Sequence, residues 1–434
     1  MRKIKFECFF FLMICMLSTA CDFFSCHKKE KETEPEYNAN ELWRIKLGDI
    51  QHVNSVIEDN YFYTFNGETE DVNERRFKVL KINLKNPSDI IVSQEFQGTE
   101  STHLLIVEEK LIFFTQSSQI IILNKNDLSV IKKQYIGYPR IYDKVCEYKG
   151  NLYWANFREY SENENGERIY ARKNIIRANL QEIIDFTGNI FPIEYLCDEF
   201  NGERVVSLYI ENGVLYFLTF NRDWWKENDE KSYLIAWDLD LNKKIWVNEI
   251  SKEMFLSEGD FKIAEGKIYL IGNYGRYCYD MITGKKEWSR VQNDEDRFKE
   301  IIIHTADLSK DMLFYDEKIY FTNEESFMSG KASGHPKENY KNILCISAKD
   351  GSYVWGDMIH FGISNFIVPC EYNNKIYFST EKGLRVYEAQ KGKLIGVDKE
   401  YNCSGQDPMY KYNDILLFFV NQYDHIDLVA MKAE

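Results

Sequence analysis

The sequence predicts an all-β fold, namely an eight-bladed β-propeller of four-stranded antiparallel blades, closed by the N-terminal strand. Three observations lead to this prediction. Short β-rich runs alternate with Asn, Asp, Gly and Lys turns, one turn-and-strand pattern recurs eight times, and the two ends of the chain supply complementary parts of one blade. The chain has 434 residues, of which 44% are hydrophobic and 15% aromatic, so it can bury a large core.

The recurring element is a turn followed by a pair of large apolar residues. The pairs are Tyr61-Phe62, Leu111-Ile112, Leu152-Tyr153, Leu215-Tyr216, Ile268-Tyr269, Ile319-Tyr320, Ile376-Tyr377 and Leu416-Leu417. Successive pairs recur at a period of roughly 50 residues, and a period of this size indicates a propeller or a solenoid rather than separate domains.

The second half of each unit repeats as well. Residues 278–288 align with residues 345–355, and the turn glycine and the tryptophan keep their spacing in both. Ile245-Trp246 follows the same plan without the glycine, whereas residues 392–396 keep the glycine and lose the tryptophan. We therefore expect four strands in each unit, and radial stacking buries both apolar faces of such a sheet.

Residues 280–288 (DMITGKKEW), together with the preceding Gly266–Leu270 (GKIYL), resemble the repeats of pyrroloquinoline-quinone-like β-propellers. This group includes the eight-bladed lipoprotein of the outer-membrane barrel-assembly machine. The resemblance covers residues 41–434. It implies the propeller fold, and it suggests that partners are met through loops on one face of the ring.

The two ends of the body predict how the ring closes. The eighth unit stops at Met431–Glu434, too early for a fourth strand, whereas Leu42–Leu47 is an outer strand with a tryptophan and no unit before it. We expect this N-terminal strand to complete the last blade, which removes two open sheet edges.

The N-terminal segment, residues 1–20, is typical of a secretory signal peptide. Arg2, Lys3 and Lys5 precede a mostly apolar stretch that is too short to span a bilayer as a mature helix. Leu17–Cys21 (LSTAC) resembles a bacterial lipoprotein box, although the leucine stands one place earlier than in the family pattern. We expect lipidation at Cys21; Cys26 is a weaker alternative acceptor, and an ordinary cleaved signal is the other interpretation.

Three regions follow from this interpretation: a signal peptide over residues 1–20, a lipidated flexible tether over 21–40, and a single propeller domain over 41–434. The tether is expected to be flexible because residues 27–40 are polar and nearly devoid of apolar groups. The chain is then held at a membrane by its lipid, with the propeller outside the cytoplasm, facing the periplasm or the cell surface.

Motifs for catalysis are not found, and we expect neither an enzyme nor a cofactor. Quinone-dependent dehydrogenases of this fold usually carry two adjacent cysteines and a calcium ion over the axis, but this sequence has no Cys-Cys pair. It also has no haem attachment motif, no Cys-x-x-Cys or His-x-x-x-His metal spacing, no Gly-x-Ser-x-Gly and no phosphate loop. His304, His335 and His360 lie in different segments and are not expected to be metal ligands.

Four of the six cysteines in the body are expected to be buried thiols. Cys278 and Cys345 are equivalent in neighbouring blades, and Cys146 and Cys370 are equivalent four blades apart. Facing sheets lie about 10 Å apart, farther than the Cα separation that a disulfide allows. The sequence leaves Cys197 and Cys403 undecided.

Insertions concentrate in two classes of loop that emerge on the same face of the ring. Second-to-third loops are expected to be long in blades one, three, four and six, at residues 66–76, 158–173, 221–231 and 323–341. Blade-to-blade loops are expected to be long at Asp185–Arg204 and Ser289–Lys310. One face is therefore elaborated, mainly over blades three to six.

The elaborated loops supply the candidate partner-binding residues. They are Arg222, Trp224, Trp225, Tyr160 and Tyr340, with Tyr170 in the same class of polar loop. Exposed Trp, Tyr and Arg dominate binding hot spots. The alternative is that these aromatic side chains cover their own loops.

The leading functional hypothesis is a non-catalytic envelope lipoprotein that acts as a protein-binding scaffold through this face. A carbohydrate or small-ligand binding module is the first alternative, and a degenerate quinone-type oxidoreductase is the second. Nucleic acid is not an expected partner, because the formal net charge is −15 and affinity for phosphates depends on clustered Lys and Arg.

Overall fold

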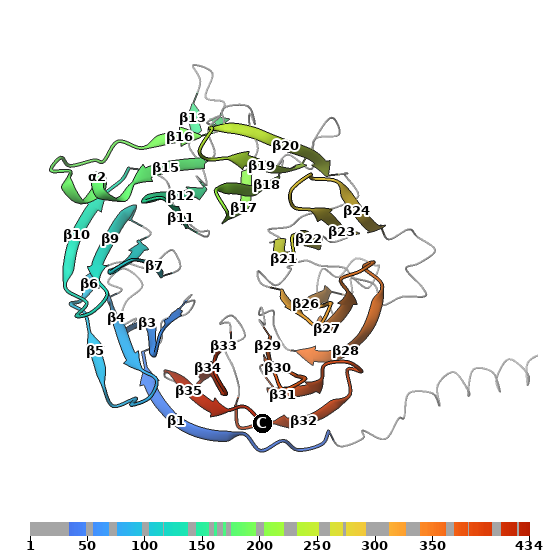
Figure 1. Ribbon diagram of the computed structural model, residues 1–434. Coiled ribbons are helices and arrows are strands. Elements are labelled where there is room, and N and C mark those ends of the chain that lie inside the picture. Colours follow the sequence, from blue (N-terminus) through green and yellow to red (C-terminus); the bar gives the residue numbers. More distant parts are fainter. Residues whose placement is uncertain are drawn as a thin grey trace, which may run out of the picture.

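The computed structural model describes residues 34–434 apart from several internal segments. These segments are residues 49–54, 69–75, 98–103, 116, 138–144, 156–159, 163–167, 171–174, 197–203, 221–231, 251–260, 272–274, 292–311, 327–338, 362–368, 381, 402–408 and 423–424. The described strands form eight antiparallel blades arranged in a ring around a central axis (Figure 1). The predicted eight-bladed propeller is confirmed.

Each blade begins next to the axis and ends at the rim. Blade 1 contains β2 (Val56–Glu58), β3 (Tyr61–Glu68), β4 (Arg76–Asn83), β5 (Ile90–Val92) and β6 (Phe96–Gln97). Blade 2 contains β7 (Leu105–Val107), β8 (Lys110–Phe114), β9 (Gln119–Asn124) and β10 (Val130–Tyr135). Blade 3 contains β11 (Cys146–Tyr148), β12 (Asn151–Ala155), β15 (Ile175–Asn179) and β16 (Glu194–Leu196). Blade 4 contains β17 (Arg204–Glu211), β18 (Val214–Phe220), β19 (Ser232–Asp238) and β20 (Lys243–Ile250).

The second half of the ring follows the same order. Blade 5 contains β21 (Phe261–Ala264), β22 (Lys267–Ile271), β23 (Gly275–Asp280) and β24 (Lys286–Val291). Blade 6 contains β25 (Leu313–Tyr315), β26 (Lys318–Ser326), β27 (Asn339–Ser347) and β28 (Tyr353–Phe361). Blade 7 contains β29 (Cys370–Tyr372), β30 (Lys375–Thr380), β31 (Gly383–Glu388) and β32 (Leu394–Asp398). Blade 8 contains β33 (Tyr410–Tyr412), β34 (Ile415–Asn421), β35 (Ile426–Lys432) and, from the other end of the chain, β1 (Asn40–Leu47).

The predicted closure of the ring is confirmed. Strand β1 pairs with β35 in antiparallel register, from Asn40 opposite Lys432 to Leu47 opposite Ile426. Trp43 packs at the interface between blade 8 and blade 1. The first strand and the last strand thus lie in one sheet, although they come from opposite ends of the sequence.

Two sequence-based expectations need correction. Blade 1 has five strands, because β5 and β6 both pair with β4. The segment Asp185–Arg204, expected as a long blade-to-blade loop, contains the fourth strand of blade 3. A short helix, α2 (Leu180–Asp185), stands where the other blades have a turn, and Asn179 caps it by accepting bonds from the N–H groups of Gln181 and Glu182. This insertion moves β16 further along the chain than the repeat predicts.

Among the described residues, buried apolar side chains form eight clusters, one at each interface between neighbouring blades. Strand β22 shows how one strand serves two clusters. Ile268 and Leu270 pack toward blade 4, whereas Tyr269 and Ile271 pack toward blade 6, because successive strand side chains point to opposite faces. Second strands such as β8, β18 and β34 are therefore nearly continuous in apolar residues.

The repeated glycine and tryptophan meet between blades, not within one blade. The indole N–H groups of Trp246, Trp288 and Trp355 donate to the first carbonyl of the next blade's turn, at Met281, Ala348 and Ala389, over 3.0–3.2 Å. Each ring lies against the turn glycine of that next blade, namely Gly284, Gly351 or Gly392. These glycines have φ between 65° and 71°, so the position needs both a left-handed backbone and the absence of a Cβ.

The segment before β1 explains why blade 7 lacks its tryptophan. Residues 35–37 add to the outer edge of β32 in parallel, with bonds from Tyr37 N to Val397 O (3.0 Å) and from Val397 N to Pro35 O (2.9 Å). Gly396 occupies the tryptophan position, and a Cβ there would lie 2.8 Å from Glu36 O. The chain itself fills the space that a tryptophan fills elsewhere.

Residues 34–39 were assigned to the flexible tether by sequence, but they contact blade 7. Tyr37 and Ala39 pack on the core between blades 7 and 8, and the hydroxyls of Tyr37 and Tyr377 are hydrogen-bonded. Glu34 pairs with Arg385, whose side chain is only 4% exposed and also contacts Asp357 of blade 6. Two hydrogen bonds to the edge of β32 and an ion pair with the buried Arg385 order this segment. The sequence did not predict these contacts, because they involve polar groups and residues far away in the chain. Within the described residues, no helix has the length and apolar character needed to cross a membrane.

A pair of glycine substitutions in blade 5 should separate backbone strain from packing between blades. Gly284 and Gly266 have nearly the same φ, 68° and 71°. A Cβ at Gly284 would lie 2.6 Å from Trp246 Cδ2, whereas a Cβ at Gly266 meets nothing within 4 Å. We expect Gly266→Ala to cost about 1 kcal/mol of stability through its left-handed backbone alone. Gly284→Ala should cost about 1–3 kcal/mol more by overpacking.

Urea unfolding followed by tryptophan fluorescence measures both free energies of unfolding. Equal losses in the two variants would show that the contact between tryptophan and glycine does not constrain the turn.

Candidate functional site

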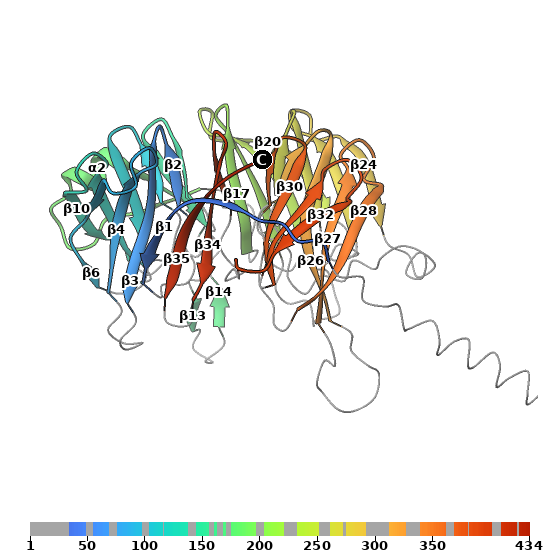
Figure 2. The ribbon, with the colours of Figure 1, turned by 90° about the horizontal axis from the view of Figure 1, so that it is seen from below.

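The expected elaborated face is visible in the strands that the structure describes. Between β12 and β15, an additional hairpin of β13 (Tyr160–Glu162) and β14 (Arg168–Tyr170) stands apart from the main sheet of blade 3. Seen from the side, this hairpin lies toward the face of the ring opposite α2 (Figure 2). In blade 6, β26, β27 and β28 are nine residues long, and β26 pairs with β27 as far as Ser326 opposite Asn339. One face of the ring therefore carries added strand structure in blades 3 and 6.

Two candidate binding residues lie in strands, not in polar loops as expected. Tyr160 of β13 is opposite Tyr170 of β14, and Tyr340 of β27 is opposite both Glu325 and His360. The sequence signal for the hairpin is Asn165-Gly166 between two short β-rich runs, a pair of residues that favours tight hairpin turns. Arg222, Trp224 and Trp225 lie outside the described residues, as does the predicted lipid acceptor Cys21. Of the five predicted binding residues, the structure therefore places only Tyr160 and Tyr340, which belong to blades 3 and 6.

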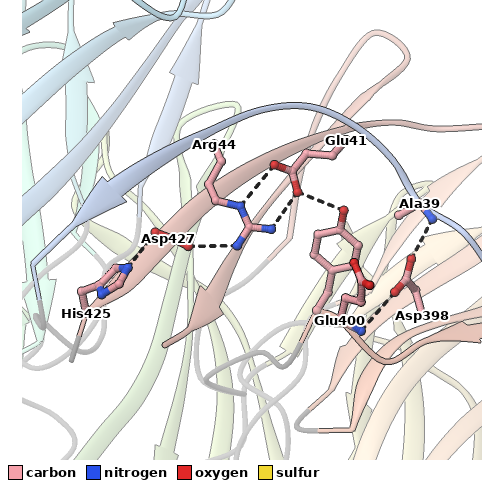
Figure 3. A network of polar contacts seen from close by, with 8 residues as sticks. Ala39, Glu41, Arg44, Asp398, Glu400, His425 and Asp427 are labelled. Atoms are coloured by element: carbon pink, nitrogen blue, oxygen red, sulfur yellow. Dashed lines mark hydrogen bonds and ion pairs between the residues drawn. The ribbon is translucent and has the colours of Figure 1, made fainter. Parts of the chain in front are cut away.

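A polar network at the junction of blades 7 and 8 connects the N-terminal strand to the C-terminal part of the chain (Figure 3). Arg44 of β1 is its centre. The guanidinium donates to Glu41 over 2.7 Å and to Asp427 of β35 over 2.9 Å, and Asp427 also contacts His425 over 3.2 Å. Arg44 therefore makes one contact within the N-terminal strand, with Glu41, and one with the last strand of the chain, with Asp427.

The network continues into blade 7. The hydroxyl of Tyr401 donates to Glu41 over 3.0 Å. The two carboxylate oxygens of Asp398 accept from the backbone N–H groups of Ala39 (2.8 Å) and Glu400 (3.1 Å). Both sides of the junction are thus held by carboxylates that accept several hydrogen bonds each.

The pKa shifts of Glu41 and Arg44 favour the charged form of each group. The guanidinium of Arg44 lowers the pKa of Glu41 by hydrogen bonding, with a smaller contribution from the Tyr401 hydroxyl. Glu41 in turn raises the pKa of Arg44. A catalytic acid or base needs a pKa near the working pH, and these two shifts move the groups away from it. The network is a structural clamp.

The cysteines are reduced and chemically quiet where the structure describes them. Cys146, Cys278, Cys345 and Cys370 are free, as expected; the last three are buried and Cys146 is half-buried. Burial raises the pKa of the Cys278, Cys345 and Cys370 thiols to about 12, so little reactive thiolate forms near neutral pH. Cys197 and Cys403 lie outside the described residues.

A cluster of side chains that could hold a metal ion is not found in the part of the chain that the structure describes. No three His, Cys, Asp or Glu side chains in this part of the chain come close enough to hold a metal ion.

Acid should weaken the clamp, and Glu41→Gln tests this. A carboxyl with a lowered folded-state pKa stabilises the protein above its unfolded pKa of about 4.3, and this stabilisation disappears as the pH falls through the folded-state value. We expect Glu41→Gln to lose about 0.5–1 kcal/mol at pH 7, because the pair is partly exposed. The difference from the parent should shrink progressively as the pH falls through the lowered folded-state pKa of Glu41.

Urea unfolding midpoints across this pH range measure the effect. Glu400→Gln is the matched control, because Glu400 contributes only its backbone N–H to the network. A loss for Glu41→Gln that stays constant with pH would contradict the proposed charge pairing.

Comparisons with known proteins show the fold. No protein-family model matches the chain, and no curated protein matches its sequence. Among solved structures, BamB from Moraxella catarrhalis is similar with a TM-score of 0.57 and 9% identity, covering 91% of this chain and 98% of BamB. The quinohemoprotein alcohol dehydrogenase from Comamonas testosteroni has a TM-score of 0.61 and 10% identity, covering 91% and 76%. A europium-containing methanol dehydrogenase has a TM-score of 0.58 and 12% identity, covering 92% and 95%. The resemblance drawn from the repeats is confirmed at the level of the fold.

Proposed function

We propose that this chain is a non-catalytic lipoprotein of the cell envelope that acts as a protein-binding scaffold through the elaborated face of its propeller. The observation that carries the proposal is the asymmetry of the ring. Blades 3 and 6 extend strands on one face, where the sequence also places its longest insertions. Loops grouped on a rigid scaffold are a common arrangement for binding sites.

Three further features support the proposal. The fold is that of BamB over nearly the whole of both chains, and the repeats resemble those of the barrel-assembly lipoprotein. The segment that ends at Cys21 has the pattern of a lipoprotein signal. The seam that closes the ring is a clamp with matched charges, which suits a rigid platform.

Capture of an envelope protein tests the scaffold role. The tagged chain would be purified from detergent-solubilised envelopes of its own cells, and co-purifying proteins would be identified by mass spectrometry. We expect Trp224→Ala with Trp225→Ala to reduce capture of a specific partner at least about tenfold, the loss that corresponds to removing one hot-spot residue. The melting temperature should change little, because the prediction places both side chains on the surface.

Ile190→Ala is the control, since Ile190 is an exposed apolar residue at the edge of blade 2. A large fall in melting temperature with capture intact would mean that the two tryptophans are packing residues and that the binding site lies elsewhere.

Lipidation is tested separately. Cys21→Ala should move the protein from the membrane fraction to the soluble fraction, because the diacylglyceryl group and its acyl chains supply the attachment. Cys26→Ala should leave the protein in the membrane. Membrane retention of the variant with both cysteines replaced would rule out a lipid anchor.

A quinone-type oxidoreductase is the second candidate, because two of the similar structures are dehydrogenases of the same fold. Reconstitution of the purified protein with pyrroloquinoline quinone and calcium distinguishes the two functions. Stoichiometric quinone binding with dye-linked alcohol oxidation would favour the enzyme and contradict the scaffold.

A further inference from the structure

The turns between the third and outer strands carry an uneven distribution of charge. In blades 4 to 7 these turns are residues 239–244, 281–286, 348–352 and 389–393, and together they hold seven lysines and two aspartates. Their formal charge is +5 in a chain whose net charge is −15. The equivalent turns of blades 1 and 2, residues 84–89 and 125–129, are each neutral, and α2 of blade 3 carries two acidic residues and no basic one.

The lysines of blades 4, 5 and 7 come in pairs that project from the rim. They are Lys243 and Lys244, Lys285 and Lys286, and Lys391 and Lys393, all of them exposed. Blade 6 adds Lys349, which is also exposed. We call the four turns that carry these residues the basic rim.

The two aspartates of the basic rim are already paired with cations from outside it. Asp240 contacts Lys149 of blade 3 over 2.7 Å, and Asp350 contacts Arg290 of β24 over 3.4 Å. These neighbours compensate the only acidic side chains in the four turns. Lys391 contacts Glu388 of β31 over 3.5 Å, but it is 77% exposed, and an exposed pair of this kind is weak. Asp238 and Asp280 border the turns of blades 4 and 5 and accept from their backbone N–H groups, so the rim is lysine-rich but carries some acidic neighbours.

The four turns follow one another along one arc of the ring. Trp246 of blade 4 bonds to the turn of blade 5, Trp288 bonds to that of blade 6, and Trp355 bonds to that of blade 7. Their outer strands, β20, β24, β28 and β32, succeed each other around the rim in Figure 1. The four lysine-bearing turns thus belong to consecutive blades along one arc of the ring.

Large apolar side chains are exposed within the same arc. Ile282 of the blade 5 turn is 75% exposed and Leu241 of the blade 4 turn is 62% exposed. Ile245 at the start of β20, and Tyr353 and Val354 at the start of β28, are exposed as well. Aliphatic and aromatic tips that project among lysines are the composition of a surface that enters the headgroup layer of an anionic membrane.

The attachment of the N-terminal segment also places the basic rim near a membrane. Residues 34–39 join the ring at blade 7, the last blade of the basic rim. If Cys21 carries lipid, only the segment 22–33 separates the acceptor from Glu34. A fully extended segment of this length reaches at most about 45 Å, so the anchored ring stays close to the bilayer.

We propose that the basic rim of blades 4 to 7 docks on anionic lipid headgroups, so that the rim lies on the bilayer while the elaborated loops remain available to a protein partner. This inference rests on the proposed lipid anchoring for its location in the cell. The affinity of the rim for lipid is a property of the folded ring and is measured without the anchor.

Vesicle flotation tests the rim with the chain from residue 22 onward, which contains every residue that the structure describes and lacks the signal and the lipid. The vesicles consist of phosphatidylcholine with or without phosphatidylglycerol. We expect binding only when phosphatidylglycerol is present. Binding should fall as NaCl rises from about 0.1 M to about 1 M, because the Debye length shortens from about 10 Å to about 3 Å.

Two variants separate the contributions of charge and apolar contact. Replacing Lys243, Lys244, Lys285 and Lys286 by Gln should weaken binding at least about tenfold, since each lysine near an anionic surface contributes appreciably. Leu241→Ser with Ile282→Ser should weaken it less, and the remaining binding should be more sensitive to salt. Replacing the exposed Lys85, Lys382, Lys399 and Lys432 by Gln removes the same charge elsewhere and should have little effect.

Equal binding to both vesicle types, no binding to either, or equal losses in the two lysine variants would overturn the proposal. Capture of an acidic protein through the rim lysines without vesicle binding would assign the surface to a protein and overturn it as well. Failure of the Cys21→Ala fractionation alone would remove the anchor and leave the measured affinity of the rim intact.

Discussion

The contact between neighbouring blades is the interaction on which the rest of the structure depends. Each four-stranded sheet has two apolar faces, and no blade can bury both by itself. Alternate side chains of one strand therefore belong to two different core clusters, as Ile268 and Tyr269 do. The ring must close for the last face to be buried, so stability is a property of the whole circle.

Closure of the ring by β1 changes the local structure of blades 7 and 8. The third and outer strands of blade 8 come from opposite ends of the sequence, so no turn connects them. The clamp around Arg44 joins the two strands by charge, and the segment before β1 fills the tryptophan position of blade 7 at Gly396. At blade 7, residues 35–37 therefore lie against the position that holds a tryptophan in blades 4, 5 and 6.

The same architecture separates two surfaces. The turns between the third and outer strands of blades 5, 6 and 7 are short, and the tryptophan of the previous blade packs directly on each of them. This constraint limits those turns to small changes, such as the lysines and exposed aliphatic residues of the basic rim. The opposite face has no such contact among the described residues and accepts an added hairpin in blade 3. A lipid-facing rim and a partner-facing loop surface are the functional interpretation that we propose for this difference.

The sequence by itself determined the fold class, the number of blades and the identity of the closing strand, whereas only the tertiary structure decided which residues meet across blades and across the ends of the chain. The alternation of apolar residues and the spacing between Gly284 and Trp288 are local patterns. They recur in several units of the repeat and can therefore be recognised from the sequence. Even the free cysteines could be predicted, because equivalent positions in neighbouring blades are too far apart for a disulfide.

The tryptophan and the glycine look like partners within one unit, but the ring places each tryptophan on the next unit's glycine. Polar residues 34–39 are typical of a free tether, yet an open strand edge and the buried cation of Arg385 hold them. The basic rim is likewise invisible in an acidic sequence, because its lysines belong to different units and come together only through the stacking of blades. The physical reason is the same in each case: these contacts depend on which surfaces the closed ring brings together, and a local pattern carries no information about them.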